Sequence, residues 1–384
     1  METPQKNLLT GADLLDRVLG NPEKYARLVN KSYHKELPLV SLCYSSMCNL
    51  GRPDDPRWDE VTLSCRGVII NTETKEIVSK AWNKFFNYDP QINKLDITQN
   101  DSYILEKLDG SLGISYREPG TNRVRIATKN SFYSEMAIVA NKWIDKKIET
   151  LGYDPFIDGF TYLFEIIYPE NYSTLIPYGD RKECVLLGII YNFTGGELSV
   201  DHVDDWAKEH GFSRPKRYRF KDFISIVEHC KSLPWNDEGY VVTLLTGDGS
   251  FKYKIKGDKF VELHRLVFGL GPRRIWKSVR DGIDVPLMLE AVPSEIKAAK
   301  LEIYNKVISD RDEIVANARI KFQEIFEEGI SRKDFALKTQ ALPKQYKGLM
   351  FTLLDGNEEK LYLGAIKQIE DNFKQKDEEE ENIE

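Results

Sequence analysis

The stretch from about Pro38 to Lys256 carries short runs of apolar and β-branched residues, of the length that strands have. Turn residues such as Asp-Gly, Pro-Gly and Gly-Gly separate many of these runs. The pattern predicts strands over Leu63–Ile70, Lys75–Trp82, Tyr103–Glu106, Leu112–Tyr116, Val124–Thr128, Tyr162–Tyr168, Val185–Asn192, Tyr240–Leu245 and Phe251–Ile255. Helical stretches interrupt the series at Ser134–Thr150, Val203–His210 and Lys221–Cys230. This mixture predicts an α+β domain built on antiparallel sheets.

After about Lys259 the strand pattern stops and a helical pattern replaces it. Ile296, Ala299, Ile303 and Val307 are spaced three and four residues apart, as on one face of a helix. We therefore expect a domain with an N-terminal extension over residues 1–259 and an all-helical domain over residues 260–375. The segment 376–384 contains a run of five acids and is expected to be a disordered tail.

Composition narrows the class of protein. The chain has 384 residues, of which 41% are hydrophobic and 30% charged, so a sizeable core can form and a wholly disordered chain is excluded. Apolar runs are far shorter than the ~20 residues that cross a membrane, and no secretory signal is visible. The five cysteines form no CxxC pair, which favours free thiols in the cytoplasm. A net charge of −7 excludes a uniformly basic nucleic-acid-binding protein but not a local basic site.

Several familiar catalytic motifs are absent from the sequence. We find no GxxxxGK[ST] phosphate loop, no HExxH, no GxSxG and no GxGxxG that opens a helix. The five histidines are isolated from one another, so a histidine metal site is not expected. Any chemistry must therefore be carried by lysines and carboxylates.

The segment Glu106–Ser111, with the sequence EKLDGS, lies between two predicted strands. Lys107 stands beside a tight Asp-Gly turn, which would let a ligand approach the backbone closely, so this lysine suits a nucleophile. The alternative is an ordinary hairpin with an exposed lysine. KxDG occurs by chance in roughly one chain of this length in ten, so the motif alone is weak.

Further motifs follow and precede this segment in a fixed order. Downstream come Glu165 inside a strand, Glu238-Gly239 at the start of another, and the alternating pair Lys254 and Lys256. Alternation places both lysines, with Lys252, on one strand face, where they could reach phosphate oxygens. Upstream lie the sequences CRG at 65–67 and KFFN at 84–87. Each motif alone could be a surface charge or a strand-end carboxylate, but the ordered set is harder to explain by chance.

This order of motifs resembles that of the covalent nucleotidyltransferases, which comprise DNA ligases, RNA ligases and RNA capping enzymes. The sequences CRG and KFFN, together with Ser111, make the chain similar to the RNA ligase 1 family typified by the T-even bacteriophage enzyme. The similarity covers about Leu63 to Gly257. DNA ligases and capping enzymes place an OB-fold after the Lys-x-Lys strand. This chain has a helical pattern there, so no OB-fold is expected.

The resemblance implies roles for the residues that would bind ATP. Lys107 would be the adenylated lysine, and Glu165 would hold the ribose hydroxyls. Lys254 and Lys256 would contact the α-phosphate.

Further ATP contacts follow from the same resemblance. Arg66 and Lys84 would engage the β- and γ-phosphates, and Glu106 would also contact the nucleotide. Lys129 matches another motif lysine, although Asn130 replaces the glycine that the family has beside it.

The resemblance also implies a divalent metal, Mg²⁺ or Mn²⁺, at Glu238, and a role for Asp109 in the later, nucleic-acid steps. A lysine attacks phosphorus only as the neutral amine, and its ordinary pKa is ~10.4. We expect Lys254, Lys256 and the metal to disfavour the ammonium form of Lys107.

The function implied is an ATP-dependent RNA ligase that joins 5′-phosphate and 3′-hydroxyl RNA ends through lysyl-AMP and adenylated RNA. RNA repair follows as the role, with nicked tRNA as the substrate that the family suggests. We expect a monomer without membrane association, cytoplasmic and phage-encoded in an infected host. Two alternatives stay open: an RNA ligase 2-type nick-sealing enzyme, and a non-catalytic nucleic-acid-binding protein on a degenerate ligase scaffold.

Overall fold

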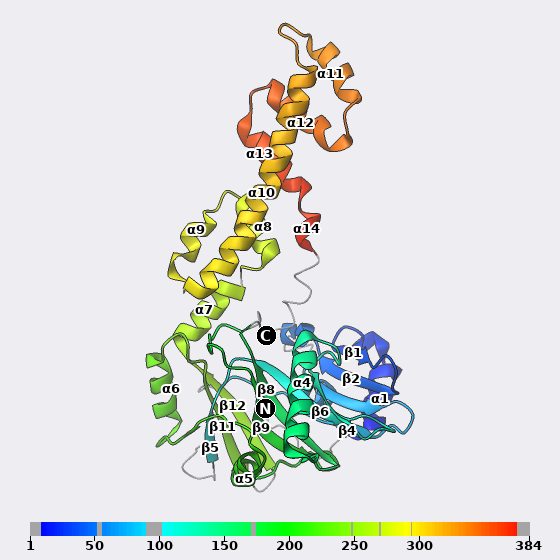
Figure 1. The fold of residues 1–384 in the computed structure, drawn as a ribbon, viewed down its shortest axis with the longest axis vertical. Coiled ribbons are helices and arrows are strands. Elements are labelled where there is room, and N and C mark those ends of the chain that lie inside the picture. Colours follow the sequence, from blue (N-terminus) through cyan, green and yellow to red (C-terminus); the bar gives the residue numbers. More distant parts are fainter. Residues whose placement is uncertain are drawn as a thin grey trace. The chain divides into compact units, whose positions relative to one another are not determined.

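Three four-stranded antiparallel sheets form the first part of the chain, among the residues that the structure describes. In the computed structural model these residues are 9–51, 56–89, 102–169, 174–246, 249–268, 270–292 and 294–374. The chain divides into two compact units, Met1–Glu262 and Leu263–Glu384. Figure 1 shows the strands in the first unit and helices in the second.

The first sheet has the order β1-β2-β3-β4. Its strands are β1 (Val29–Tyr33), β2 (Leu39–Tyr44), β3 (Arg66–Asn71) and β4 (Ile77–Ser79). The sequence pattern misses β1 and β2. All six residues of β2 are buried, so the strand shows no alternation of apolar and polar positions.

The predicted strand Leu63–Ile70 is wrong at its start. A short helix, α3 (Glu60–Ser64), occupies that region, and β3 begins only at Arg66. The helix forms because Asp59 and Thr62 make a reciprocal capping box, in which each side chain bonds the other's backbone N–H.

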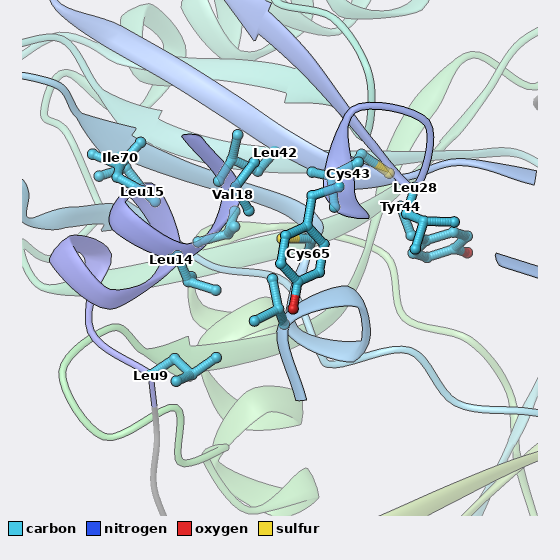
Figure 2. Packing of buried hydrophobic residues seen from close by; sticks show 14 of the residues in the cluster. Leu9, Leu14, Leu15, Val18, Leu28, Leu42, Cys43, Tyr44, Cys65 and Ile70 are labelled. Atoms are coloured by element: carbon cyan, nitrogen blue, oxygen red, sulfur yellow. The ribbon is translucent and has the colours of Figure 1, made fainter. Parts of the chain in front are cut away.

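An apolar cluster packs the N-terminal helix against this sheet. Helix α1 (Gly11–Gly20) presents Leu14, Leu15 and Val18 towards Leu42 of β2, and all four are buried. Figure 2 shows these side chains together with the thiols of Cys43 and Cys65. Two short helices, α2 (Pro22–Tyr25) and the 3₁₀ helix η1 (Ser46–Leu50), complete this part.

The second sheet has the order β10-β5-β11-β12, and its strands carry Glu106, Lys254 and Lys256 of the predicted site. Its strands are β10 (Arg217–Tyr218), β5 (Ser102–Glu106), β11 (Gly239–Thr246) and β12 (Gly249–Lys256). Helix α6 (Phe223–Ser232) packs on it through Phe223, Ile226 and Cys230.

The third sheet has the order β7-β6-β8-β9. Its strands are β7 (Val124–Thr128), β6 (Ser111–Arg117), β8 (Phe160–Ile167) and β9 (Glu183–Tyr191). Helix α4 (Glu135–Leu151) begins after the N-cap Ser134 and packs against β6, β7 and β9 (Figure 1). Helix α5 (Val200–His210) contributes Val203 and Ala207 to the same core.

The second unit is helical throughout its described residues, as expected. Its helices follow α7 (Asp258–Phe268), which spans the boundary between the units. They are α8 (Pro272–Arg280), α9 (Val285–Met288), η2 (Leu289–Ala291), α10 (Ser294–Ile325), α11 (Arg332–Gln340), α12 (Lys344–Leu354), α13 (Glu358–Gln368) and α14 (Asp371–Lys374). The expected acidic tail, 376–384, lies outside the described residues. The α+β fold with antiparallel sheets and a helical C-terminal region is confirmed. None of the helices in the described ranges is long and apolar enough to cross a membrane.

The capping box at Asp59 gives a test of the first sheet's packing. Asp59→Ala removes the acceptor for the Thr62 N–H and should lower the free energy of unfolding by about 1–2 kcal/mol. Asp59→Asn keeps an acceptor at that position and should lose less. Thermal and urea unfolding of the three proteins would measure the difference, and equal losses in both variants would contradict the capping role.

Candidate active site

Lys107 lies where two strands of the second sheet meet. It follows the last residue of β5, and its backbone N–H donates to the carbonyl of Gly239, the first residue of β11, at 2.8 Å. Its Nζ lies 2.6 Å from Oε2 of Glu238, and Nζ of Lys256 lies 3.2 Å from Oε1 of the same carboxylate. Glu238 is buried, with 4% of its surface exposed. One carboxylate therefore bridges the two motif lysines.

Two positions of the site, Gly239 and Gly110, require glycine. Gly239 has φ 131°, and a Cβ there would lie 2.1 Å from the carbonyl oxygen of Ile255. A Cβ at Gly110 would lie 2.7 Å from Cγ of Glu165. The two glycines let β11 approach β12 and let the KLDG segment approach β8.

Glu165 lies against this segment from β8. Burial raises the pKa of its carboxyl to about 7, with smaller upward effects from Glu238 and Asp109, while Lys107 opposes the rise. The KLDG turn and β8 thus bring a second acid close to Lys107.

Asp109 faces the segment that leads into β9. Its Oδ2 accepts hydrogen bonds from the backbone N–H groups of Leu175 and Ile176, at 2.6 and 3.1 Å. Its own N–H donates to the hydroxyl of Tyr178 at 2.8 Å. Burial and the charge of Glu238 raise the pKa of Asp109 to about 6, although the two backbone donors oppose this.

The expectation that neighbouring cations disfavour the ammonium form of Lys107 is wrong for this arrangement. Burial lowers the pKa of Lys107, but the charges of Glu238 and Glu165 outweigh burial and raise it above its ordinary value. The expected effect falls on Lys254 instead. Burial, and then the cations of Lys107 and Arg66, hold the pKa of Lys254 well below its usual range.

The remaining motif cations gather around Lys254. The KFFN segment runs beside β12: Asn87 pairs with Lys254, whose N–H donates to the carbonyl of Phe86 at 3.1 Å. Arg66, Lys84 and Lys256 act on the charge of Lys254.

Lys129 lies beside the CRG segment, close to Gly67. A Cβ at Gly67 would lie 3.1 Å from Cα of Lys129, so the two backbones are close. Burial raises the pKa of the Cys43 thiol, and the ammonium group of Lys129 opposes that rise. Burial lowers the pKa of Lys129, and the charge of Arg66 lowers it further. Four cations from separate parts of the sequence therefore act on one another: Arg66 and Lys84 act on Lys254, and Arg66 acts on Lys129.

Two residues lie apart from this set. The carboxylate of Glu106 accepts the backbone N–H of Lys216 at 3.2 Å, at the edge next to β10. Lys252 does not reach towards phosphate as the alternation suggested. Its Nζ lies 2.8 Å from Glu197 and 3.1 Å from the hydroxyl of Tyr103, in a buried ion pair.

The sequence motifs do not include three of the aromatic residues that lie at the site. Tyr178 bonds a residue 69 positions away, and Tyr44 and Trp58 lie beside Lys84. None of the three stands in a motif that was recognised, so no local signal identified them.

The donor set fits a divalent metal only together with a phosphate ligand. Among the described residues, no group of three or more His, Cys, Asp or Glu side chains could hold a metal ion. Mg²⁺ commonly uses one or two carboxylates with phosphate oxygens and water. Glu238 suits that role, since its oxygens face the lysines that would contact the same phosphates.

Comparison with known proteins identifies relatives of one kind. The model of a family described as RNA ligase matches residues 64–260. A protein of Autographa californica nuclear polyhedrosis virus, assigned as a bifunctional polynucleotide kinase/RNA ligase, is 25% identical over 227 residues, which cover 53% of this chain and 31% of that protein. A protein of Thermovibrio ammonificans assigned as an RNA ligase is 28% identical over 190 residues, 46% of each chain. The chain thus spans less than half of the length of these curated relatives.

Solved structures of Naegleria gruberi RNA ligase also match. The complex with PPi has a TM-score of 0.34 and 17% identity, and the match covers 46% of this chain and 59% of that one. A mutant with ATP and Mn has a TM-score of 0.34 and 16% identity, covering 44% and 53%.

The raised pKa of Glu165 predicts a pH dependence of stability. The folded pKa of about 7 exceeds the ordinary 4.5, so the folded state holds the proton more tightly. The resulting stabilisation is complete below pH ~4.5 and is lost as pH rises towards 7, by about 1–3 kcal/mol. Glu165→Gln should therefore gain stability relative to the wild type between pH 5 and pH 8.

Thermal unfolding in excess chelator at the two pH values measures this gain. Glu73→Gln, at an exposed glutamate, serves as the matched control. A difference between Glu165→Gln and the wild type that stays constant with pH would refute the prediction.

Proposed function

Because this chain belongs to the RNA ligase family, in its T4 RNA ligase 1 branch, we propose that it is an ATP-dependent RNA ligase. It would join RNA 5′-phosphate and 3′-hydroxyl ends through lysyl-AMP and adenylated RNA. The observation that carries the proposal is the convergence of the motif residues on Lys107. That lysine is bridged through Glu238 to Lys256 and lies beside Lys254.

In the first step, Nζ of Lys107 attacks the α-phosphorus of ATP. A P–N bond forms, the bond from that phosphorus to the bridging oxygen breaks, and pyrophosphate leaves. The ammonium must first lose a proton, and Glu238 at 2.6 Å is an acceptor in place. When ATP binds, the ammonium groups of Lys254 and Lys256 can contact the α-phosphate oxygens. Lys256 would then exchange its contact with Glu238 for one with phosphate.

The cation set suits a triphosphate. ATP carries about four negative charges, and Arg66 and Lys84 would take the β- and γ-phosphates, with Lys129 nearby. Burial and the neighbouring cations lower the pKa of Lys254, and a bound anion would offset the repulsion between these cations, so the site favours a phosphate ligand. Mg²⁺ or Mn²⁺ bound at Glu238 would neutralise developing charge on the phosphates.

The acids would orient the rest of the nucleotide and the RNA. Glu165 would accept hydrogen bonds from the ribose hydroxyls, and Glu106 would contact the nucleotide from the strand edge. Asp109 would act after adenylation, when AMP passes to the 5′-phosphate of RNA and a 3′-hydroxyl then displaces it.

The physiological role proposed is RNA repair, with nicked tRNA as substrate and a phage-infected cytoplasm as the setting. We propose that residues 1–259 form the adenylyltransferase domain and act as part of a monomer. Residues 260–375 would help to bind RNA, through exposed basic residues on α8: Arg273, Arg274 and Lys277. The alternatives, a nick-sealing RNA ligase 2-type enzyme and a non-catalytic scaffold, are separated from this proposal by the experiments below.

The first experiment tests the nucleophile. Lys107→Ala should abolish AMP attachment from labelled ATP, and Lys107→Arg should be equally inactive, since guanidinium stays protonated. Excess chelator should stop labelling of the wild type. Mass spectrometry would locate the AMP. Label on Lys254 in the Lys107→Ala protein would assign the nucleophile to the other lysine, and an unlabelled wild type would favour the non-catalytic scaffold.

The second experiment tests the division of labour between the units. A fragment that ends at Gly271 retains every motif residue and should still form lysyl-AMP. It should lose joining of a structured RNA more than joining of a short single strand, and both activities should weaken with salt as phosphate contacts are screened. Labelling and both ligations are measured beside the full-length protein, with nicked duplex as a third substrate. A folded fragment that cannot adenylate would refute the first domain, and preferred sealing of nicked duplex would favour the RNA ligase 2-type alternative.

A further inference from the structure

The phosphate-binding cations are held by aromatic rings. Nζ of Lys84 lies 4.7 Å from the ring centre of Tyr44, 5.3 Å from that of Trp58 and 5.5 Å from that of Phe86. Within the described residues, its one side-chain hydrogen bond goes to the hydroxyl of Tyr44, at 3.3 Å. Three ring faces therefore surround one ammonium.

The same arrangement holds for the neighbouring cations. Phe85 lies under two of them, 5.0 Å from the guanidinium of Arg66 and 4.9 Å from Nζ of Lys254. Lys129 lies 5.7 Å from the ring of Tyr44. Each cation of this group thus faces at least one ring.

The rings also brace one another. The rings of Tyr44 and Trp58 pack edge to face, with their centres 5.0 Å apart. Those of Trp58 and Phe86 pack in the same way, with their centres 5.3 Å apart. Such contacts fix ring orientation. Trp58 therefore contacts both Tyr44 and Phe86. We call these three residues, together with Phe85 next to Phe86 in the chain, the aromatic wall.

Carboxylates are absent from this group, in the part of the chain that the structure describes. Arg66, Lys84, Lys129 and Lys254 form no ion pair there. Nη1 of Arg66 is buried and has no hydrogen-bond partner among the residues described. Lys252, on the same strand as Lys254, is by contrast neutralised by Glu197. The group is built to keep its positive charge uncompensated.

A ring face holds a cation differently from a carboxylate. The ring attracts the cation through its quadrupole, and it adds no net negative charge that an incoming phosphate must displace. The cation keeps its N–H donors available for phosphate oxygens. A carboxylate in the same place would compete with the ligand.

We propose that Trp58 and Phe85, with the ring of Tyr44, are positioning residues that hold Arg66, Lys84, Lys129 and Lys254 ready for the polyphosphate of ATP. The inference rests on the proposed function, because it takes ATP as the ligand. It goes beyond it in assigning the affinity for the triphosphate to residues that do not touch the reacting atoms.

The test separates the ring face from mere volume. Trp58→Leu and Phe85→Leu remove a face and should raise the KM for ATP in Lys107 adenylation about 10-fold, with the rate at saturating ATP changed far less. Trp58→Phe and Phe85→Tyr keep a face and should stay within about threefold of the wild type. Tyr44→Phe separates the hydroxyl contact from the ring. Phe193→Leu, at a ring that is 86% exposed and outside the wall, is the matched control.

Joining of pre-adenylated RNA, which needs no triphosphate, supplies the second readout. The ratio of ATP-driven to pre-adenylated joining should fall in the Leu variants at low ATP and recover at saturating ATP. Equal KM values in the Leu variant, the ring-retaining variant and the wild type would overturn the inference, as would a fall in maximal rate with KM unchanged. A wild type that neither acquires AMP nor joins RNA would instead refute the proposed function. Circular dichroism confirms folding, and the two independent positions keep the test decisive should one variant misfold.

Discussion

The rest of the site depends on the buried carboxylate of Glu238 between the ammonium groups of Lys107 and Lys256. A buried charge is costly unless it is paired, so these three side chains must be brought together as the protein folds. The pairing joins the end of β5, the start of β11 and the end of β12 at one point. Gly239 makes this possible, since any side chain there would collide with the backbone of β12.

The lysines of β12 show how the surroundings decide what a cation can do. Lys252 and Lys254 lie on one face of the strand, two residues apart. Glu197 and Tyr103 satisfy Lys252, which therefore links the strand to the chain after β9. Lys254 faces Phe85, and burial and the neighbouring cations hold its pKa well below its usual range. Identical residues in one alternating pattern thus have different surroundings: one is paired with a carboxylate and the other lies among cations.

The acids of the site balance the cations on the other side of Lys107. Glu165 and Asp109 have raised pKa values because they are buried beside each other and beside Glu238. Lys107 stabilises these charges, and they raise its own pKa in return. Under the proposed function, ATP and a metal ion would change the partners of Glu238, and the reactivity of Lys107 would depend on that exchange rather than on a fixed low pKa.

Alternation, turn residues and local spacing are properties of neighbouring positions. The sequence alone therefore predicted β5 to β9, β11 and β12, the helical second part and the order of the motif residues, but not the two-residue strand β10. It did not predict β1 and β2, and it placed the start of a strand over the end of α3. β2 is fully buried, which removes alternation, and the capping box at α3 overrides an apolar run. Only the tertiary structure decided which charges meet. The hydroxyl of Tyr178 accepts a hydrogen bond from Asp109, 69 positions earlier, and Glu197 forms an ion pair with Lys252. The rings of Tyr44 and Trp58 lie against Lys84. Such contacts depend on how the separate sheets pack. Ion pairing and burial set the protonation state of each group, and both arise only after the sheets have packed.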